Sequence, residues 1–217
     1  MFIGHFAVAF AAKRVAPRAS LGATFIAAQL ADLLWPIFLL LGIERVQISP
    51  APQSPFLTLI FTSYPWSHSL GMEILLGAAL GALAFGVTRD GRAAVILALL
   101  VPSHWILDLI VHVPDLPLYP GGDTRLGLGL WRYPSATLIV ELLMMAGGVW
   151  MYSRSTRAQS RRGWLGLWLL VVFLLGIYAL SLVSPPPPSV TALAVTGLIG
   201  WPLAFWPWWV DRRREPR

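Results

Sequence analysis

Three ionisable side chains recur at intervals of four in the segment 104–112, which reads His104-Trp-Ile-Leu-Asp108-Leu-Ile-Val-His112. In an α-helix this spacing puts all three on one face, about 6 Å apart per step. His-x-x-x-His and His-x-x-x-Asp are spacings from which a helix presents metal ligands, whereas residues one or two apart point in different directions. The segment is therefore a candidate metal or proton-relay site, with structural packing of polar groups as the other interpretation.

The remaining ionisable groups of the apolar runs extend this candidate site. All four histidines lie in or at the ends of apolar runs, together with four carboxylates: His5, His68, His104, His112, Asp32, Glu73, Asp108 and Glu141. An ionised side chain in hydrocarbon costs at least ~2.5 kcal/mol, so each needs a partner. The chain has no cysteine. Any metal must therefore be held by histidine and carboxylate, which suit zinc or another divalent ion.

The composition shows which kind of scaffold must position these groups. Of the 217 residues, 57% are hydrophobic and 12% charged, and the mean hydropathy is +0.69. A soluble fold cannot cover that much apolar surface. The net charge of +6 does not indicate a nucleic-acid partner, because the arginines lie in short clusters between apolar runs, as orientation in a bilayer requires.

The apolar runs predict an all-α, polytopic transmembrane helix bundle of about seven helices with no soluble domain. Each run of about 20 apolar residues is long enough to cross a bilayer. We treat 1–217 as a single integral membrane domain, with a site-bearing five-helix part at 2–150 and two accessory C-terminal helices at 164–209. The expected helices are 2–16, which is shorter and amphipathic, and 20–43, 67–87, 93–113, 133–152, 164–184 and 189–209.

The basic residues predict the orientation of these helices. If seven spans alternate, the loops 13–18, 88–92 and 153–163 and the C-terminal tail lie on one side and carry thirteen of the sixteen Lys and Arg. By the positive-inside rule that side is cytoplasmic, which puts the N-terminus outside and the C-terminus inside. Every ionisable candidate then lies in the middle or outer half of the bilayer. A shared depth indicates one converging site rather than scattered polar packing.

The ordered motifs resemble those of a family of bacterial inner-membrane proteins, the metal-dependent hydrolases of the LexA-binding, inner-membrane-associated type. That family opens with Gly-His or Thr-His, and carries Pro-Asp-x-Asp, Arg-Gly-x-Thr-His-Ser and Ser-His-x-x-x-Asp elements on successive helices. This chain has Gly4-His5, Ala31-Asp32, Trp66-Ser67-His68-Ser69-Leu70 and Ser103-His104-Trp105-Ile106-Leu107-Asp108. The resemblance covers about residues 4–120.

The resemblance implies a polar constellation of His5, Asp32, His68, His104 and Asp108, and a place in a bacterial inner membrane. The chain departs from the family pattern at three points. Leu34 stands where a second aspartate is expected, Ala31 replaces the proline, and no basic residue precedes Ser67 and His68.

These features lead to a hydrolase hypothesis. His68, His104 and one or both of Asp32 and Asp108 would hold a zinc-type ion with an open position, so that bound water becomes a nucleophile at neutral pH. Glu73 is the first candidate for general base, with a structural partnership to an arginine or a backbone group as the alternative. His112 and Asp115, at the outer mouth, would orient the ligands or bind a polar head group.

The expected substrate is a membrane lipid or another small amphiphile, because the site would open to the outer leaflet of a protein without a soluble domain. The Pro- and Gly-rich segment 114–132 is expected to cover the site or to form a surface loop. Glu141 is expected either to approach the site or to pair with Arg132. The rival hypothesis is a proton- or metal-ion-coupled transporter, since intramembrane His and Asp chains also relay ions.

Overall fold

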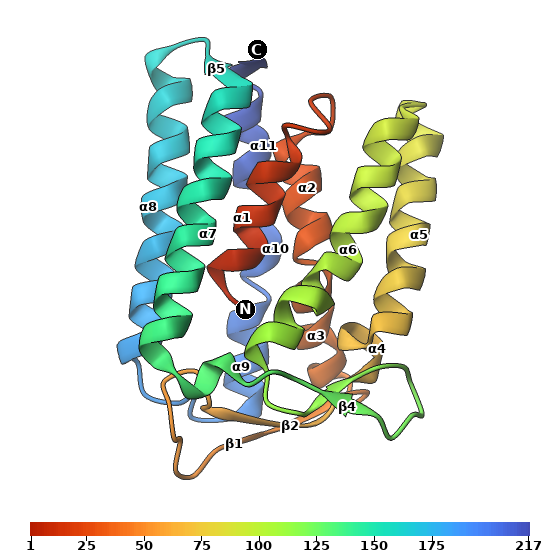
Figure 1. The fold of residues 1–217 in the computed structure, drawn as a ribbon, viewed down its shortest axis with the longest axis vertical. Helices are drawn as coiled ribbons and strands as arrows, with labels where there is room; N and C mark the ends of the chain where they lie inside the picture. Colours follow the sequence, from red (N-terminus) through yellow and green to blue (C-terminus); the bar gives the residue numbers. More distant parts are fainter.

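The computed structural model describes residues 1–217 as a bundle of membrane-length helices with short strands at its two ends (Figure 1). Five helices are long and apolar enough to cross a membrane, and a sixth span forms if one bent pair is counted together. No soluble domain is present. The helices are α1 (Ile3–Ala12), α2 (Leu21–Ala28), α3 (Leu30–Leu40), α4 (Pro65–His68), α5 (Leu70–Thr88), α6 (Gly91–Val111), α7 (Pro134–Ser155), α8 (Arg161–Val183), α9 (Val190–Gly197), α10 (Gly200–Leu203) and α11 (Phe205–Asp211).

The predicted all-α membrane bundle is confirmed, with three differences in how the apolar runs fold. The opening run, expected over 2–16, is helical only over α1, and ten residues span about 15 Å, half the hydrocarbon thickness. The run 20–43 bends by 54° between α2 and α3. The last run divides into α9, α10 and α11 within one apolar stretch, Val190–Asp211.

Serine and aspartate side chains cap the beginnings of five helices, among them α2, α5 and α6. The Ser20 and Ser69 hydroxyls accept from backbone N–H groups of α2 and α5, and the Asp90 carboxylate does the same for α6. Such caps satisfy N–H groups that have no intrahelical partner. Large apolar side chains on α5 to α8 are exposed, among them Leu83 and Val172, as a lipid-facing surface requires.

Close helix packing depends on glycine at two places. Gly77 and Gly81 of α5 lie against α6, where an added Cβ would meet the carbonyl oxygens of Ala98 and Ala94. Gly148 of α7 lies against the backbone of α1 in the same way. Small residues four apart let helices approach closely in a membrane. The contact at Gly148 likewise lets α1 pack closely against α7.

Short antiparallel strand pairs lie at both ends of the bundle. The strands are β1 (Arg45–Ile48) with β2 (Leu59–Ser63), β3 (Leu116–Pro117) with β4 (Arg125–Leu126), and β5 (Thr156–Ala158) with β6 (Arg214–Pro216). The pairs β1–β2 and β3–β4 lie at one end, with a 3₁₀ turn at Leu130–Arg132 before α7, while β5 and the C-terminus lie at the opposite end (Figure 1). We call these the hairpin end and the basic end.

The basic end holds the loops and tail predicted to be cytoplasmic, together at one end as expected (Figure 1). A buried ion pair closes it: the Lys13 ammonium lies 2.6 Å from the Asp211 carboxylate, which also accepts from the Tyr152 hydroxyl and the Leu21 N–H. Lys13, the residue after the end of α1, turns inward to form this pair. The orientation of this end toward the cytoplasm stays a prediction.

Candidate metal centre

The five predicted ligands come together between α1, α3, α4 and α6. Their ligand atoms form two groups that share His104, and within each group these atoms lie within 4.8 Å of one another. The groups are His5, Asp32 and His104, and His68, His104 and Asp108. All the ligands are buried except Asp32, whose side chain is 42% exposed. Of the five predicted ligands, only Asp32 is accessible from outside the cluster.

A backbone carbonyl determines the protonation of His104. Its Nδ1 lies 2.9 Å from the Ala28 carbonyl oxygen, and because a carbonyl can only accept, Nδ1 carries the proton. Ala28 is the last residue of α2, where helix carbonyls lack intrahelical partners. When the ring is neutral, this tautomer presents the lone pair of Nε2 to the cluster. This Nε2 is buried and has no hydrogen-bond partner in the structure.

His68 is held in the same tautomer by a serine and a glutamate. The Ser67 hydroxyl donates to Glu44 Oε2 at 2.6 Å and lies 2.7 Å from His68 Nδ1. Since its one proton goes to the carboxylate, the hydroxyl oxygen accepts from the His68 Nδ1–H. Glu44, which is 1% exposed, also accepts from the backbone N–H groups of Trp66 and Ser67 at the start of α4. A histidine backed in this way is typical of metal ligands.

The two Nε2 atoms face carboxylate oxygens at separations longer than hydrogen bonds. His68 Nε2 lies 3.4 Å from Asp32 Oδ1, and His104 Nε2 lies 3.9 Å from the same oxygen and 3.5 Å from Asp108 Oδ2. N–H···O bonds in proteins measure about 2.7–3.2 Å. With both rings neutral, lone pairs of nitrogen and oxygen converge here at more than hydrogen-bond distance, which is an arrangement that a cation stabilises.

His5 takes a different position from the other ligands. Its Nε2 lies 3.1 Å from Asp108 Oδ1, a hydrogen-bond distance, and its ring stacks on His104 with centroids 3.6 Å apart and planes 5° from parallel. The second nitrogen, Nδ1, is buried without a partner. The amino group of Met1 also contacts Asp108 Oδ1. His5 thus supports Asp108 and lies beside the shared ligand His104.

Glu141 holds the beginning of α1, and so the position of His5. Its carboxylate accepts from the backbone N–H of Phe2 at 2.9 Å and of Gly4 at 3.1 Å, and it is fully buried. A carboxylate at the N-terminus of a helix is stabilised by the free N–H groups and the helix dipole. The expected pairing of Glu141 with Arg132 is wrong. Glu141 acts on the site indirectly, because it holds the start of α1, which carries His5.

Glu73 lies beside the cluster with one oxygen engaged. Its Oε2 accepts from the backbone N–H of Trp105 at 3.0 Å, and its Oε1 is buried without a partner. The backbone partner matches the structural alternative for this residue. Because Oε1 is free to accept a proton, the general-base role of Glu73 stays a prediction.

His112 and Asp115 form the polar outer edge of the cluster. His112 lies between two carboxylates, with Nε2 3.5 Å from Asp108 Oδ2 and Nδ1 2.9 Å from Asp115 Oδ1. The Tyr64 hydroxyl donates to Asp115 at 3.1 Å. Burial first, and the Asp115 charge second, raise the pKa of Tyr64, so this phenol stays protonated as a donor.

A hollow of about 320 Å³ adjoins this edge at the hairpin end. It has apolar walls from β2 and the loop before it, and carries the exposed Arg132 and the partly exposed Asp115; its lining residues include Leu57, Leu59, Ile60, Phe61, Asp115 and Arg132. The segment 114–132 closes the neighbouring end of the bundle, since the Pro117 carbonyl accepts from the Trp105 indole and the Leu118 carbonyl from the Gly71 N–H.

Sequence reasoning missed Glu44 and Ser67. Glu44 lies outside the apolar runs from which the candidate residues were taken. The Ser-His pair occurs twice, as Ser67-His68 and Ser103-His104, but only the first serine supports its histidine. The Ser103 hydroxyl donates to the Leu100 carbonyl of its own helix.

Comparisons with protein-family models, with curated proteins and with solved structures find no match to this chain. The assignment of the site therefore depends on its own geometry.

Proposed function

We propose that the chain is a membrane-embedded, metal-dependent hydrolase that acts on a lipid or another small amphiphile. In this proposal a divalent, zinc-type ion is bound by His68 and His104 together with one or both of Asp32 and Asp108, and one coordination position stays open. The membrane is the bacterial inner membrane and the site faces its extracytoplasmic side, as the basic end and the resemblance of the motifs indicate.

The observation that carries the metal site is the spacing of the facing lone pairs. Two ligands that each bind a tetrahedral zinc ion at about 2.0–2.1 Å lie about 3.3 Å apart. The three nitrogen–oxygen separations, 3.4, 3.5 and 3.9 Å, approach that length and exceed hydrogen-bond lengths. Three buried polar atoms without partners also lie in this region: His5 Nδ1, His104 Nε2 and Glu73 Oε1.

The surrounding residues suit a catalytic rather than a closed structural site. Structural metal sites are fully coordinated by protein, whereas catalytic sites keep one position for water or substrate. The exposed side of Asp32 provides such access. A divalent ion bound here would lower the pKa of a coordinated water toward about 7. Glu73, through its unpartnered Oε1, is the candidate acceptor of the proton that this water releases.

The hollow at the hairpin end supports an amphiphile as substrate. Its apolar wall along β2 suits a hydrocarbon chain, while Arg132 and Asp115 suit a polar head group. Asp115 connects this hollow to Asp108 through His112. The bond that is cleaved would be an ester, an amide or a phosphoester, all of which a metal-activated water attacks.

The alternative is a proton- or metal-ion-coupled transporter, in which protons occupy the same nitrogen atoms. In that case His68 and His104 would each carry two protons and pair with Asp32 and Asp108 as ions. The long separations favour a metal, because an imidazolium beside a carboxylate forms a shorter, charge-assisted hydrogen bond of about 2.7–2.9 Å.

The metal content of the purified protein tests the central proposal. Protein exposed to zinc and then dialysed should retain the ion, whereas His104→Ala and Asp108→Ala should lose it and the matched variant Ser103→Ala should keep it. A wild-type protein that retains no divalent ion would refute the metal site.

Catalysis and transport are then separated by their products. Incubation with mixed membrane lipids, followed by mass spectrometry, should give products that require the metal and disappear in Glu73→Gln. Proton or metal flux in proteoliposomes without any lipid product would support the transporter instead.

A further inference from the structure

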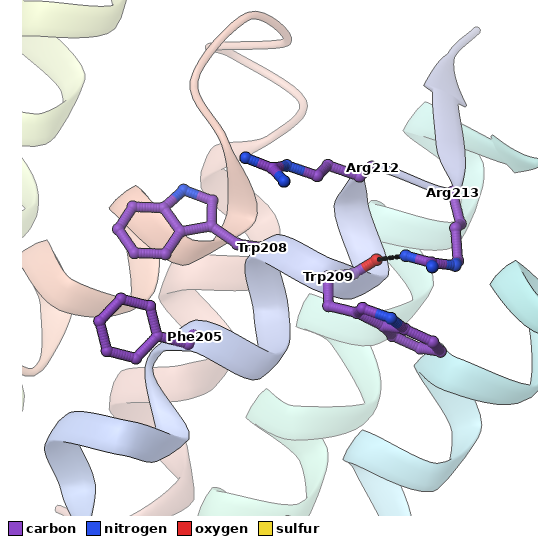
Figure 2. Close-up of a pocket in the computed structure, with 5 residues that line it drawn as sticks. All are labelled: Phe205, Trp208, Trp209, Arg212 and Arg213. Carbon is purple, nitrogen blue, oxygen red and sulfur yellow. Dashed lines mark hydrogen bonds between the residues drawn. The ribbon is translucent and has the colours of Figure 1, made fainter.

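A second hollow, of about 610 Å³, is lined by residues of α11 and the two arginines that follow it, at the basic end of the bundle. It is formed by one short stretch at the end of the last apolar run. Figure 2 shows the residues that line it, with the Arg212 guanidinium above the Trp208 ring and the Arg213 guanidinium above the Trp209 ring: Phe205, Trp208, Trp209, Arg212 and Arg213. Because α11 ends the stretch Val190–Asp211, this hollow lies where a membrane-spanning segment meets the head groups.

The aromatic walls of the hollow are held in place by the helices behind them. The Trp208 indole N–H donates to the Ser20 hydroxyl, and its ring lies against Gly22. The Trp209 ring lies against Gly166 of α8, and Arg213 lies over it with its guanidinium carbon 4.1 Å from the ring centroid. Arg213 also donates to the Trp209 carbonyl at 3.1 Å (Figure 2). The walls are therefore formed before any ligand binds.

Of the two arginines that line the hollow, Arg212 is the one whose side chain has no partner. It is exposed, and its guanidinium makes no hydrogen bond or ion pair within the chain. The neighbouring carboxylate of Asp211 is already bound by Lys13, the Tyr152 hydroxyl and the Leu21 N–H. In Figure 2 the Arg212 guanidinium extends over the Trp208 side of the hollow. A guanidinium in this position presents free donors to a phosphate.

We propose that this hollow binds one acidic phospholipid, with its phosphate at Arg212 and its glycerol and upper acyl chain against Phe205 and Trp208. Phe205 is 62% exposed and Trp209 is 42% exposed, so the lower wall requires an apolar ligand that a free anion does not supply. The head group is acidic because this end carries thirteen basic side chains against three acidic ones, Asp90, Asp211 and Glu215.

Native mass spectrometry of the detergent-purified protein, titrated with phosphatidylglycerol or phosphatidylcholine, tests this proposal. The wild type should retain one phosphatidylglycerol in preference to phosphatidylcholine. Arg212→Gln should weaken that binding about fivefold, the effect of one basic residue near an anionic head group. The matched control is Arg92→Gln, which removes the same charge from an exposed arginine at the same end.

The remaining outcomes decide between a specific lipid-binding site and non-specific attraction of an anionic lipid to the basic end. Phe205→Ser keeps every charge and should also weaken binding of phosphatidylglycerol. An equal loss in Arg92→Gln, or no loss in Arg212→Gln, would overturn the proposal in favour of non-specific attraction. Displacement of the lipid by millimolar inorganic phosphate would overturn it in favour of a free-anion site.

Discussion

Replacement of Ser67 by alanine is the sharpest test of how the metal centre is built. The Ser67 hydroxyl lies between Glu44 and His68, at 2.6 Å from the carboxylate and 2.7 Å from Nδ1. Without it, the His68 Nδ1–H is buried without an acceptor, which costs about 1–3 kcal/mol. Metal binding at Nε2 makes this N–H more acidic and its hydrogen bond stronger. Loss of the acceptor therefore destabilises the metal-bound state more than the metal-free state.

The expected effect is a rise in the metal dissociation constant of about 10–100-fold, the usual result of removing such a supporting hydrogen bond. This corresponds to about 1.4–2.7 kcal/mol of binding free energy. Competition with a chromophoric zinc chelator measures the dissociation constant in detergent. Ser103→Ala is the matched control, because it removes the serine of the other Ser-His pair, which only bonds its own helix. Equal affinities in the wild type and Ser67→Ala, or equal losses in both variants, would refute the reasoning.

Three further predictions concern the start of α1, its packing against α7 and the pair of Lys13 with Asp211. Glu141→Ala should weaken zinc binding more than Glu141→Gln does, because the amide oxygen still accepts from the start of α1; equal losses would count against this anchoring role. Gly148→Ala should lower thermal stability by about 1–3 kcal/mol through overpacking against α1, while Gly147→Ala, which faces open space, should be neutral or stabilising in the same melting experiment. Asp211→Ala should destabilise the protein by about 3–5 kcal/mol, since Lys13 is then a buried charge without its carboxylate partner, and an unchanged melting temperature would contradict this.

The helices were predictable because lipid imposes a simple length rule on apolar segments. The α5, α6, α7 and α8 helices begin and end within a few residues of the predicted limits. The end of the opening helix was not predictable in this way. Lys13, which follows it, contacts Asp211, a residue almost two hundred positions away in the sequence. The bend between α2 and α3 has no proline or glycine at its position, and so gave no local signal.

The members of the metal centre were predictable because ionisable groups are rare in apolar segments and therefore conspicuous. Their supports were not. Glu44 lies in a loop, where an acidic residue is ordinarily solvated, and its role depends on the packing of α4 against the end of α3. Glu141 was conspicuous, but its partners are backbone N–H groups of α1, which no pattern of side chains can indicate.

The bend at the end of α2 has a consequence for how this site can be altered. The carbonyl that holds His104 in its tautomer belongs to the main chain of Ala28, so every amino acid at position 28 supplies it. Truncation to glycine would leave this hydrogen bond intact, whereas a larger side chain at this buried position would act on it only by displacing the backbone. A change in the path of the chain, such as one that straightens α2 into α3, would remove it. The proton on His104 is in this sense a property of backbone shape rather than of a neighbouring side chain.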